Sequence, residues 1–89
     1  MSQRYAIHLD SFSGRVAQLT KAQHKDKKLV LRSLSTDPMV SYWDISESRN
    51  LQRTIKALET DNLIVSHEQP YPWYKFVVTD AGKKFMEEK

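Results

Sequence analysis

The stretch from residue 57 to residue 85, ALETDNLIVSHEQPYPWYKFVVTDAGKKF, constrains the fold of this 89-residue chain more than any other segment. It has the pattern of a helix end, an apolar strand, a proline-rich turn, a second strand and a new helix. Pro70 and Pro72 exclude a tight two-residue turn, because their fixed φ angles favour a longer and stiffer loop. The stretch therefore predicts a hairpin with strands at roughly residues 64–68 and 73–79.

The most regular helical pattern in the chain covers residues 48–60. Its apolar residues recur three and four positions apart, which places them on one face of a helix. These residues are Leu51, Ile55 and Leu58. The preceding SESRN, residues 46–50, supplies a turn and an N-cap from either Ser46 or Ser48. Asn62 follows the last turn, where asparagine is the second choice after glycine for the left-handed residue that closes a helix.

Another helix is predicted from Thr20 to about Ser35. Thr20 and Gln23 have the spacing of a capping box, in which each side chain satisfies a backbone N–H of the other residue. The inward face carries Val30, Leu31 and Leu34. Asp37 and Pro38 then fit the N-cap and the first residue of a further helix.

That further helix would be short and would cover PMVSYWDI, residues 38–45. The residues that it would bury are Met39, Val40, Trp43 and Ile45. Two aromatic residues and a β-branched valine leave a strand open as the alternative. Near the end of the chain, Thr79 and Asp80 predict the cap of a closing helix that runs through Phe85 and Met86.

Residues 1–19 are interpreted as an N-terminal extension or helix, and residues 20–89 as the main domain. The extension carries an apolar stripe at alternating steps of four and three residues: Tyr5, Leu9, Phe12, Val16 and Leu19. Residues 4–9 fit a short edge strand as an alternative. The stripe either forms a homodimer interface, which is the interpretation favoured here, or packs as ordinary core.

The composition excludes several classes of function. The chain is 39% hydrophobic and 28% charged, as expected of a folded domain, and no apolar run approaches the length of a membrane span. Without a secretory signal pattern, we expect a cytoplasmic protein. Cysteine is absent, which excludes disulfides and thiolate zinc sites.

Catalysis and cofactor binding are not expected either. His8, His24 and His67 lack the spacing that a metal site on a helix requires, so no metal ligand is predicted. Gly14 and Gly82 are the only glycines, which excludes a glycine-rich phosphate loop. No nucleophile elbow is present, and the chain is predicted not to be an enzyme.

A net charge of +3 is compatible with nucleic-acid binding. The outer face of the helix at residues 48–60 carries side chains that suit DNA: Ser48, Arg49, Asn50, Gln52, Arg53 and Lys56. Arginine can bond guanine with two N–H groups, asparagine or glutamine can pair with adenine, and serine and lysine suit phosphates. The alternative is that these residues only solvate the helix.

The predicted hairpin tip forms a second candidate site. Its residues are His67, Gln69, Tyr71 and Trp73. Three interpretations stay open for the aromatic residues: contact with nucleic acid, contact with a protein partner, or packing on the domain itself. Lys75 is expected to contact phosphate. The basic run KAQHKDKK, residues 21–28, is interpreted as a solvated face, with non-specific attraction to DNA as the functional alternative.

Three segments together resemble the winged-helix transcription regulators of the MarR type. LTKAQHKDKKLVLRSL is similar to the helix that precedes their helix-turn-helix, NLQRTIKALETDNLI to their recognition helix, and VTDAGKKF to the segment after their wing. The resemblance covers about residues 19–86. It implies that Ser48, Arg49, Asn50 and Arg53 contact bases and phosphates, and that Lys75 lies on the wing. EQPYPWYK stands where that family has an Asp-x-Arg wing signature.

We therefore expect a mainly α domain with a small β-hairpin, that is, an α+β winged helix-turn-helix. The predicted function is sequence-specific binding of double-stranded DNA by a transcription regulator. Helix 48–60 would enter the major groove, and the wing, residues 64–79, would lie on the flanking backbone. The alternative is a winged-helix protein-interaction module, an adaptor or inhibitor that docks through the aromatic wing tip.

Overall fold

The predicted hairpin is confirmed in the computed structural model, which describes residues 14–88. Strands β2 (Ile64–His67) and β3 (Trp73–Val78) pair antiparallel, with Ile64 opposite Val78 and His67 opposite Lys75. Phe76 and Val78 are buried towards the helices, while Val65 and Val77 lie on the exposed outer face. The alternation of inward and outward residues thus follows the two-residue period of a strand.

A third strand enlarges the hairpin to a three-stranded sheet. β1 (Met39–Ser41) pairs antiparallel with β3 on the side opposite β2, so that the strand order is β1-β3-β2. The prediction of a helix that starts at Pro38 was wrong, and the strand alternative holds for residues 39–41. The carboxylate of Asp37 accepts a hydrogen bond from the backbone N–H of Met39 instead of capping a helix.

Helix α3 (Tyr42–Glu47) starts after this strand. Ser41 is its N-cap, and Asp44 completes a capping box with it. Because the helix starts four residues later than expected, its side chains have a different orientation. Trp43, which was predicted to be buried, is 54% exposed.

Helix α2 (Lys27–Thr36) also begins later than expected. The hydrogen bonds of the predicted capping box between Thr20 and Gln23 form, but they precede only a 3-10 turn, η2 (Gln23–Lys25). Asp26 has an extended ψ of 107° and therefore stops the turn. Its carboxylate then accepts hydrogen bonds from two backbone N–H groups of α2 and acts as the N-cap.

Helix α4 (Arg49–Thr60) is the longest in the described residues, and its predicted ending is confirmed. Asn62 has a positive φ of 61°. Its N–H donates to the carbonyl of Glu59, and the N–H of Leu63 donates to the carbonyl of Leu58 at 2.9 Å. These two bonds form a Schellman motif, and the burial of Leu63 supplies the apolar contact that accompanies it.

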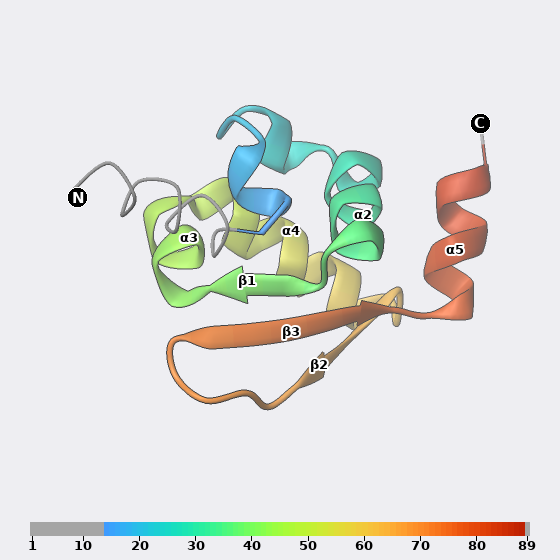
Figure 1. Ribbon diagram of the computed structural model, residues 1–89. Helices are drawn as coiled ribbons and strands as arrows, with labels where there is room; N and C mark the ends of the chain where they lie inside the picture. The colour runs from blue at the N-terminus through green and yellow to red at the C-terminus, as the bar shows by residue number, and fades with distance from the viewer. Residues whose placement is uncertain (1–13, 89) are drawn as a thin grey trace.

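The core lies between α2, α4 and the inner face of the sheet (Figure 1). Its fully buried side chains are Val16, Val30, Leu31, Leu34, Val40, Leu51 and Leu58. Val16 belongs to the 3-10 turn η1 (Val16–Gln18) and packs within its own domain, as in the ordinary-core alternative, so it cannot form part of a dimer surface here. Leu19, also in the predicted stripe, is partly buried and packs against the same core. The remaining residues of the stripe, Tyr5, Leu9 and Phe12, lie outside the described residues.

Helix α5 (Asp80–Glu87) closes the chain beside α2, at the end of the domain opposite α3 (Figure 1). Thr79 caps it as predicted, by accepting a hydrogen bond from the N–H of Gly82. The Thr79 hydroxyl also donates to the carbonyl of Asn62 at 2.7 Å, which ties the start of α5 to the end of α4. Among residues 14–88, no helix combines the length and apolar character of a membrane span.

Gly82 allows the close approach of α5 to the turn after α4. A Cβ at this position would lie 2.3 Å from the carbonyl oxygen of Leu63 and 2.7 Å from a methyl carbon of Val78. We expect Gly82→Ala to lower the free energy of unfolding by about 1–3 kcal/mol, because a backbone oxygen has no alternative position. Chemical denaturation measures this loss. Lys83→Ala, an exposed change in the same helix, should alter it by less than about 0.5 kcal/mol.

Candidate nucleic-acid interface

A buried histidine joins the segment before α2 to the start of α4. His24 is only 5% exposed. Its Nε2 lies 3.0 Å from the carbonyl oxygen of Val16 and therefore donates to it, while its Nδ1 lies 2.8 Å from the hydroxyl of Ser48. The hydroxyl of Thr54 donates to the backbone carbonyl of His24. These bonds hold residues 20–26 against one flank of α4.

Ser48 cannot act as the predicted DNA contact. Its side chain is 3% exposed, and its oxygen accepts a hydrogen bond from the N–H of Leu51 as the N-cap of α4. The same oxygen pairs with His24. The sequence left either Ser46 or Ser48 as the cap of this helix. Ser48 is the cap in the structure, and a capping hydroxyl has to point into the domain.

The other predicted residues of α4 divide into two groups. Arg49, Arg53 and Lys56 are exposed and are spaced four and three residues apart. They lie on the side of the helix opposite the buried Leu51 and Leu58. We call these three residues the basic stripe.

Two amides lie beside the basic stripe. Asn50 donates from its side chain to the carbonyl of Lys21 at 2.8 Å, and Gln52 donates to the carbonyl of Ile45 at 2.8 Å. Each amide keeps its carbonyl oxygen and one N–H for other partners, while its other N–H is engaged within the domain. The basic stripe therefore supplies the charged donors of this surface, and the amides also fix its surroundings.

Three of the four lysines of the basic run lie beside α4, which the sequence alone did not predict. The fourth, Lys28, instead donates to the carbonyl of Glu88 and lies over the ring of Phe85. His24 is buried against the start of α4, and its neighbours Lys21, Lys25 and Lys27 are exposed. Because residues 20–26 follow the flank of the helix, these lysines extend the positive surface of the basic stripe. The only sequence signal for this arrangement is the single histidine, His24, within a basic run. A histidine in such a run does not indicate that its side chain is buried.

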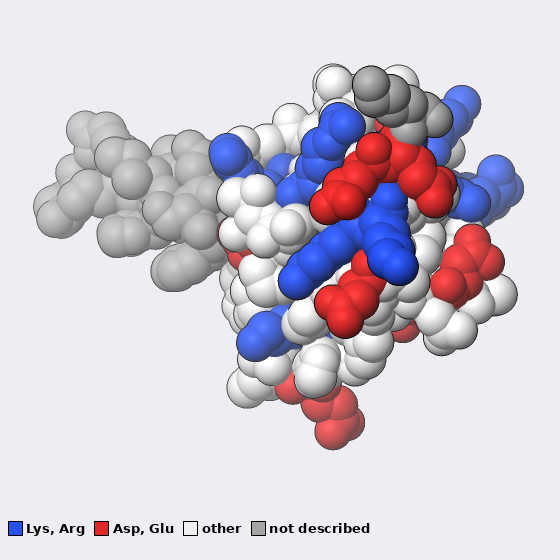
Figure 2. Space-filling model, turned by 90° about the vertical axis from the view of Figure 1, so that its right-hand side faces the viewer, with Lys and Arg blue, Asp and Glu red and all other residues white. Residues whose placement is uncertain are grey.

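The face around α5 has a different charge pattern. Figure 2 shows lysines and arginines interleaved with carboxylates on this side of the molecule. On α5 itself, Lys83 and Lys84 stand among Asp80 and Glu87. Charges of both signs at this spacing give no extended positive field on this face.

The hairpin tip packs against α3. The N–H of Tyr42 donates to the carbonyl of Pro72 at 2.7 Å, and the ring of Tyr71 lies 5.8 Å from that of Tyr42 and 6.2 Å from that of Trp43, between centroids. Tyr71 is nevertheless 73% exposed. We call Tyr42, Trp43 and Tyr71 the aromatic cluster. Only Tyr71 was predicted as part of this site.

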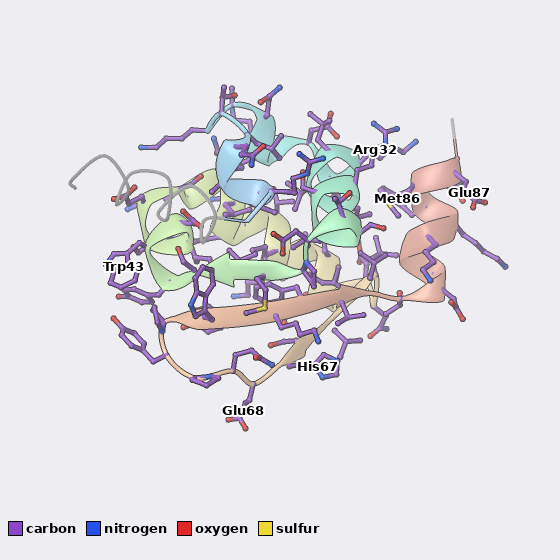
Figure 3. All side chains as sticks on the ribbon, viewed as in Figure 1. Arg32, Trp43, His67, Glu68, Met86 and Glu87 are labelled. Atoms are coloured by element: carbon purple, nitrogen blue, oxygen red, sulfur yellow. The ribbon has the colours of Figure 1, made fainter. Side chains whose placement is uncertain are left out.

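The remaining tip residues are spread over the hairpin. His67 and Glu68 extend away from the helices on the outer side of the sheet (Figure 3). Gln69 is exposed in the turn, whereas Trp73 and Lys75 are half-buried in β3. Residues 68–72 contain no lysine or arginine, so Lys75 is the cation closest to the tip along β3.

No candidate metal site is found in the described part of the chain, where His, Asp and Glu form no group of three or more. Comparisons of the chain with protein-family models, with curated proteins and with solved structures found no match. The interpretation of this surface therefore depends on the arrangement of its own residues.

Ser48→Ala tests the link between His24 and α4. The change removes the N-cap and leaves a buried ring nitrogen without a partner, and we expect the free energy of unfolding to fall by about 2–4 kcal/mol. Thermal and urea denaturation measure the loss. Ser46→Ala is the matched control, because Ser46 is exposed and only donates to the carbonyl of Trp43. Equal losses in the two variants would contradict the link.

Proposed function

We propose that this protein binds double-stranded DNA through α4 and acts as a sequence-specific transcription regulator. The observation that carries the proposal is the basic stripe, an exposed row of three cations on a helix whose other face is buried in the core. Such a helix is a rigid rod of the size that fits the major groove. The lysines at 21, 25 and 27 lie beside it and add charge on the same side.

The order of the elements supports a winged helix. α2, β1, α3, α4, β2 and β3 follow one another as helix, strand, two helices and a hairpin. In such an arrangement, α3 and α4 form the helix-turn-helix, α4 is the recognition helix and the hairpin is the wing. The likeness to MarR-type regulators belongs to this proposal and rests on the same order of segments.

Each residue of the stripe has a role in the proposed complex. Arg49 lies in the first turn of α4, where side chains of a recognition helix reach base edges, and it can bond a guanine with two N–H groups. Arg53 and Lys56 lie one and two turns further on and suit the phosphates at the groove edge. Lys75 on the hairpin would contact the flanking backbone.

A second function is favoured by the aromatic cluster. Three aromatic side chains that are 42% to 73% exposed lie together at the end of the domain where the hairpin turn meets α3. Exposed tyrosine and tryptophan are common anchors of protein interfaces. In this second candidate, the chain is an interaction module that docks through the cluster and does not need DNA.

Fluorescence anisotropy with a labelled random-sequence duplex separates the two functions. For the DNA function, we expect binding at low ionic strength that weakens steeply as salt increases, with a slope of roughly 0.9 log units per phosphate contacted. Absence of binding even at low salt would contradict the DNA function and favour docking through the aromatic cluster.

Arg49→Ala combined with Lys56→Ala tests the basic stripe. We expect the affinity to fall by at least about tenfold, because the variant lacks one base contact and one phosphate contact. Lys83→Ala combined with Lys84→Ala removes the same charge from α5 and should change the affinity less than about twofold at moderate salt. An equal loss in both double variants would show that net charge, rather than α4, attracts the duplex.

A further inference from the structure

A hollow lies between α4 and the 3-10 turn η2. Its volume is about 300 Å³. The residues that line it are Lys25, Lys27, Asn50, Arg53, Thr54 and Ala57. Three of these six carry a positive charge, and they come from two segments that are far apart in the sequence. The hollow is thus produced by the fold and is not a property of α4 alone.

Hydrogen bonds fix both walls of the hollow. Thr54 donates to the carbonyl of His24, and Asn50 donates to the carbonyl of Lys21, so that η2 is held at a set distance from α4. Ala57 has no side chain beyond Cβ and leaves the space between the walls open. A site with fixed walls does not have to order its backbone when a ligand binds, which lowers the entropic cost.

Two carboxylates near the hollow offset part of the charge of its three cations. Asp26 is the N-cap of α2, where two backbone N–H groups hold its carboxylate at the helix start. Asp61 lies 4.0 Å from the Nζ of Lys27, but both side chains are about half exposed. An exposed pair of this kind contributes little, so a phosphate that contacts several of the cations at once can displace the carboxylate of Asp61.

We infer that this hollow is the binding site of one backbone phosphate of the bound DNA, which Lys25, Lys27 and Arg53 would hold. The inference rests on the proposed function and names the residues that hold one of its phosphates. With the phosphate in the hollow, the 3-10 turn lies over one strand, Arg49 remains free to enter the groove, and Lys56 remains free to contact a phosphate at its edge. A phosphate fits the site because its oxygens can accept bonds from ammonium and guanidinium groups at once, directly or through water.

Lys25→Ala combined with Lys27→Ala tests the phosphate-binding site, in the full chain and with the random-sequence duplex. We expect the affinity to fall about tenfold and the slope of log affinity against log salt to become less steep by about 1, because the variant loses one phosphate contact. Both lysines are exposed, so the melting temperature should stay within a few degrees of that of the unmodified chain. The Lys83→Ala and Lys84→Ala double variant is again the control.

Asp61→Asn gives a test of opposite sign. The change removes the carboxylate that faces Lys27, and we expect affinity to rise about twofold to fivefold at low salt. Glu87→Gln on α5 makes the same change in net charge outside the hollow and should raise the affinity less. Ala57→Asp places a carboxylate inside the hollow and should weaken binding at least as much as the loss of both lysines.

The results separate this inference from the function on which it rests. If the Arg49 and Lys56 variant weakens binding but the Lys25 and Lys27 variant does not, the inference is wrong and the DNA function stands. If the unmodified chain does not bind the duplex at low salt, both are wrong. Equal effects of Asp61→Asn and Glu87→Gln would also contradict the phosphate-binding site, because the increase in affinity would then come from net charge alone.

Discussion

The position of the buried imidazole of His24 determines how the basic parts of this domain are arranged. One ring nitrogen donates to the carbonyl of Val16, and the other pairs with the hydroxyl that caps α4. A single side chain therefore joins η1, η2 and α4. Leaving either nitrogen unpaired in the interior would cost about 1–3 kcal/mol, which makes displacement of the 3-10 turn from α4 unfavourable. The bonds of His24 thereby also fix the backbone of the neighbouring lysines, although the lysine side chains take no part in them.

Signals confined to a few neighbouring residues allowed much of the fold to be predicted. The left-handed Asn62, the N-cap Thr79 and the proline-rich turn each depend on local backbone chemistry. β1 was predicted only as the alternative to a short helix, because its three residues have too little pattern of their own. They become a strand by pairing with β3, more than thirty residues away. The exposure of Trp43 follows from the same cause, since β1 delays the start of α3.

The candidate site was less predictable than the fold, for a related reason. Helical periodicity places Arg49, Arg53 and Lys56 on one exposed side without any knowledge of the remaining chain. Periodicity does not show that Ser48 points inwards, because a capping serine and a serine that contacts DNA have the same sequence signal. Nor does it show that Lys25 faces Arg53 across a hollow, because that arrangement depends on the buried bonds of His24 and Thr54.

The tip of the hairpin is tied to the domain. At the tip, the backbone bond between Tyr42 and Pro72 and the aromatic cluster attach the turn to α3. A turn held in this way keeps a fixed position relative to α4, because α3 precedes α4 by a single residue, Ser48. The cluster exposes aromatic rings, whereas the basic stripe and the lysines beside it expose charge. A change in salt concentration therefore acts mainly on the basic surface and little on the aromatic one. The two surfaces therefore differ in chemistry, so the proposed DNA binding through α4 and the proposed docking through the cluster differ in how they respond to salt.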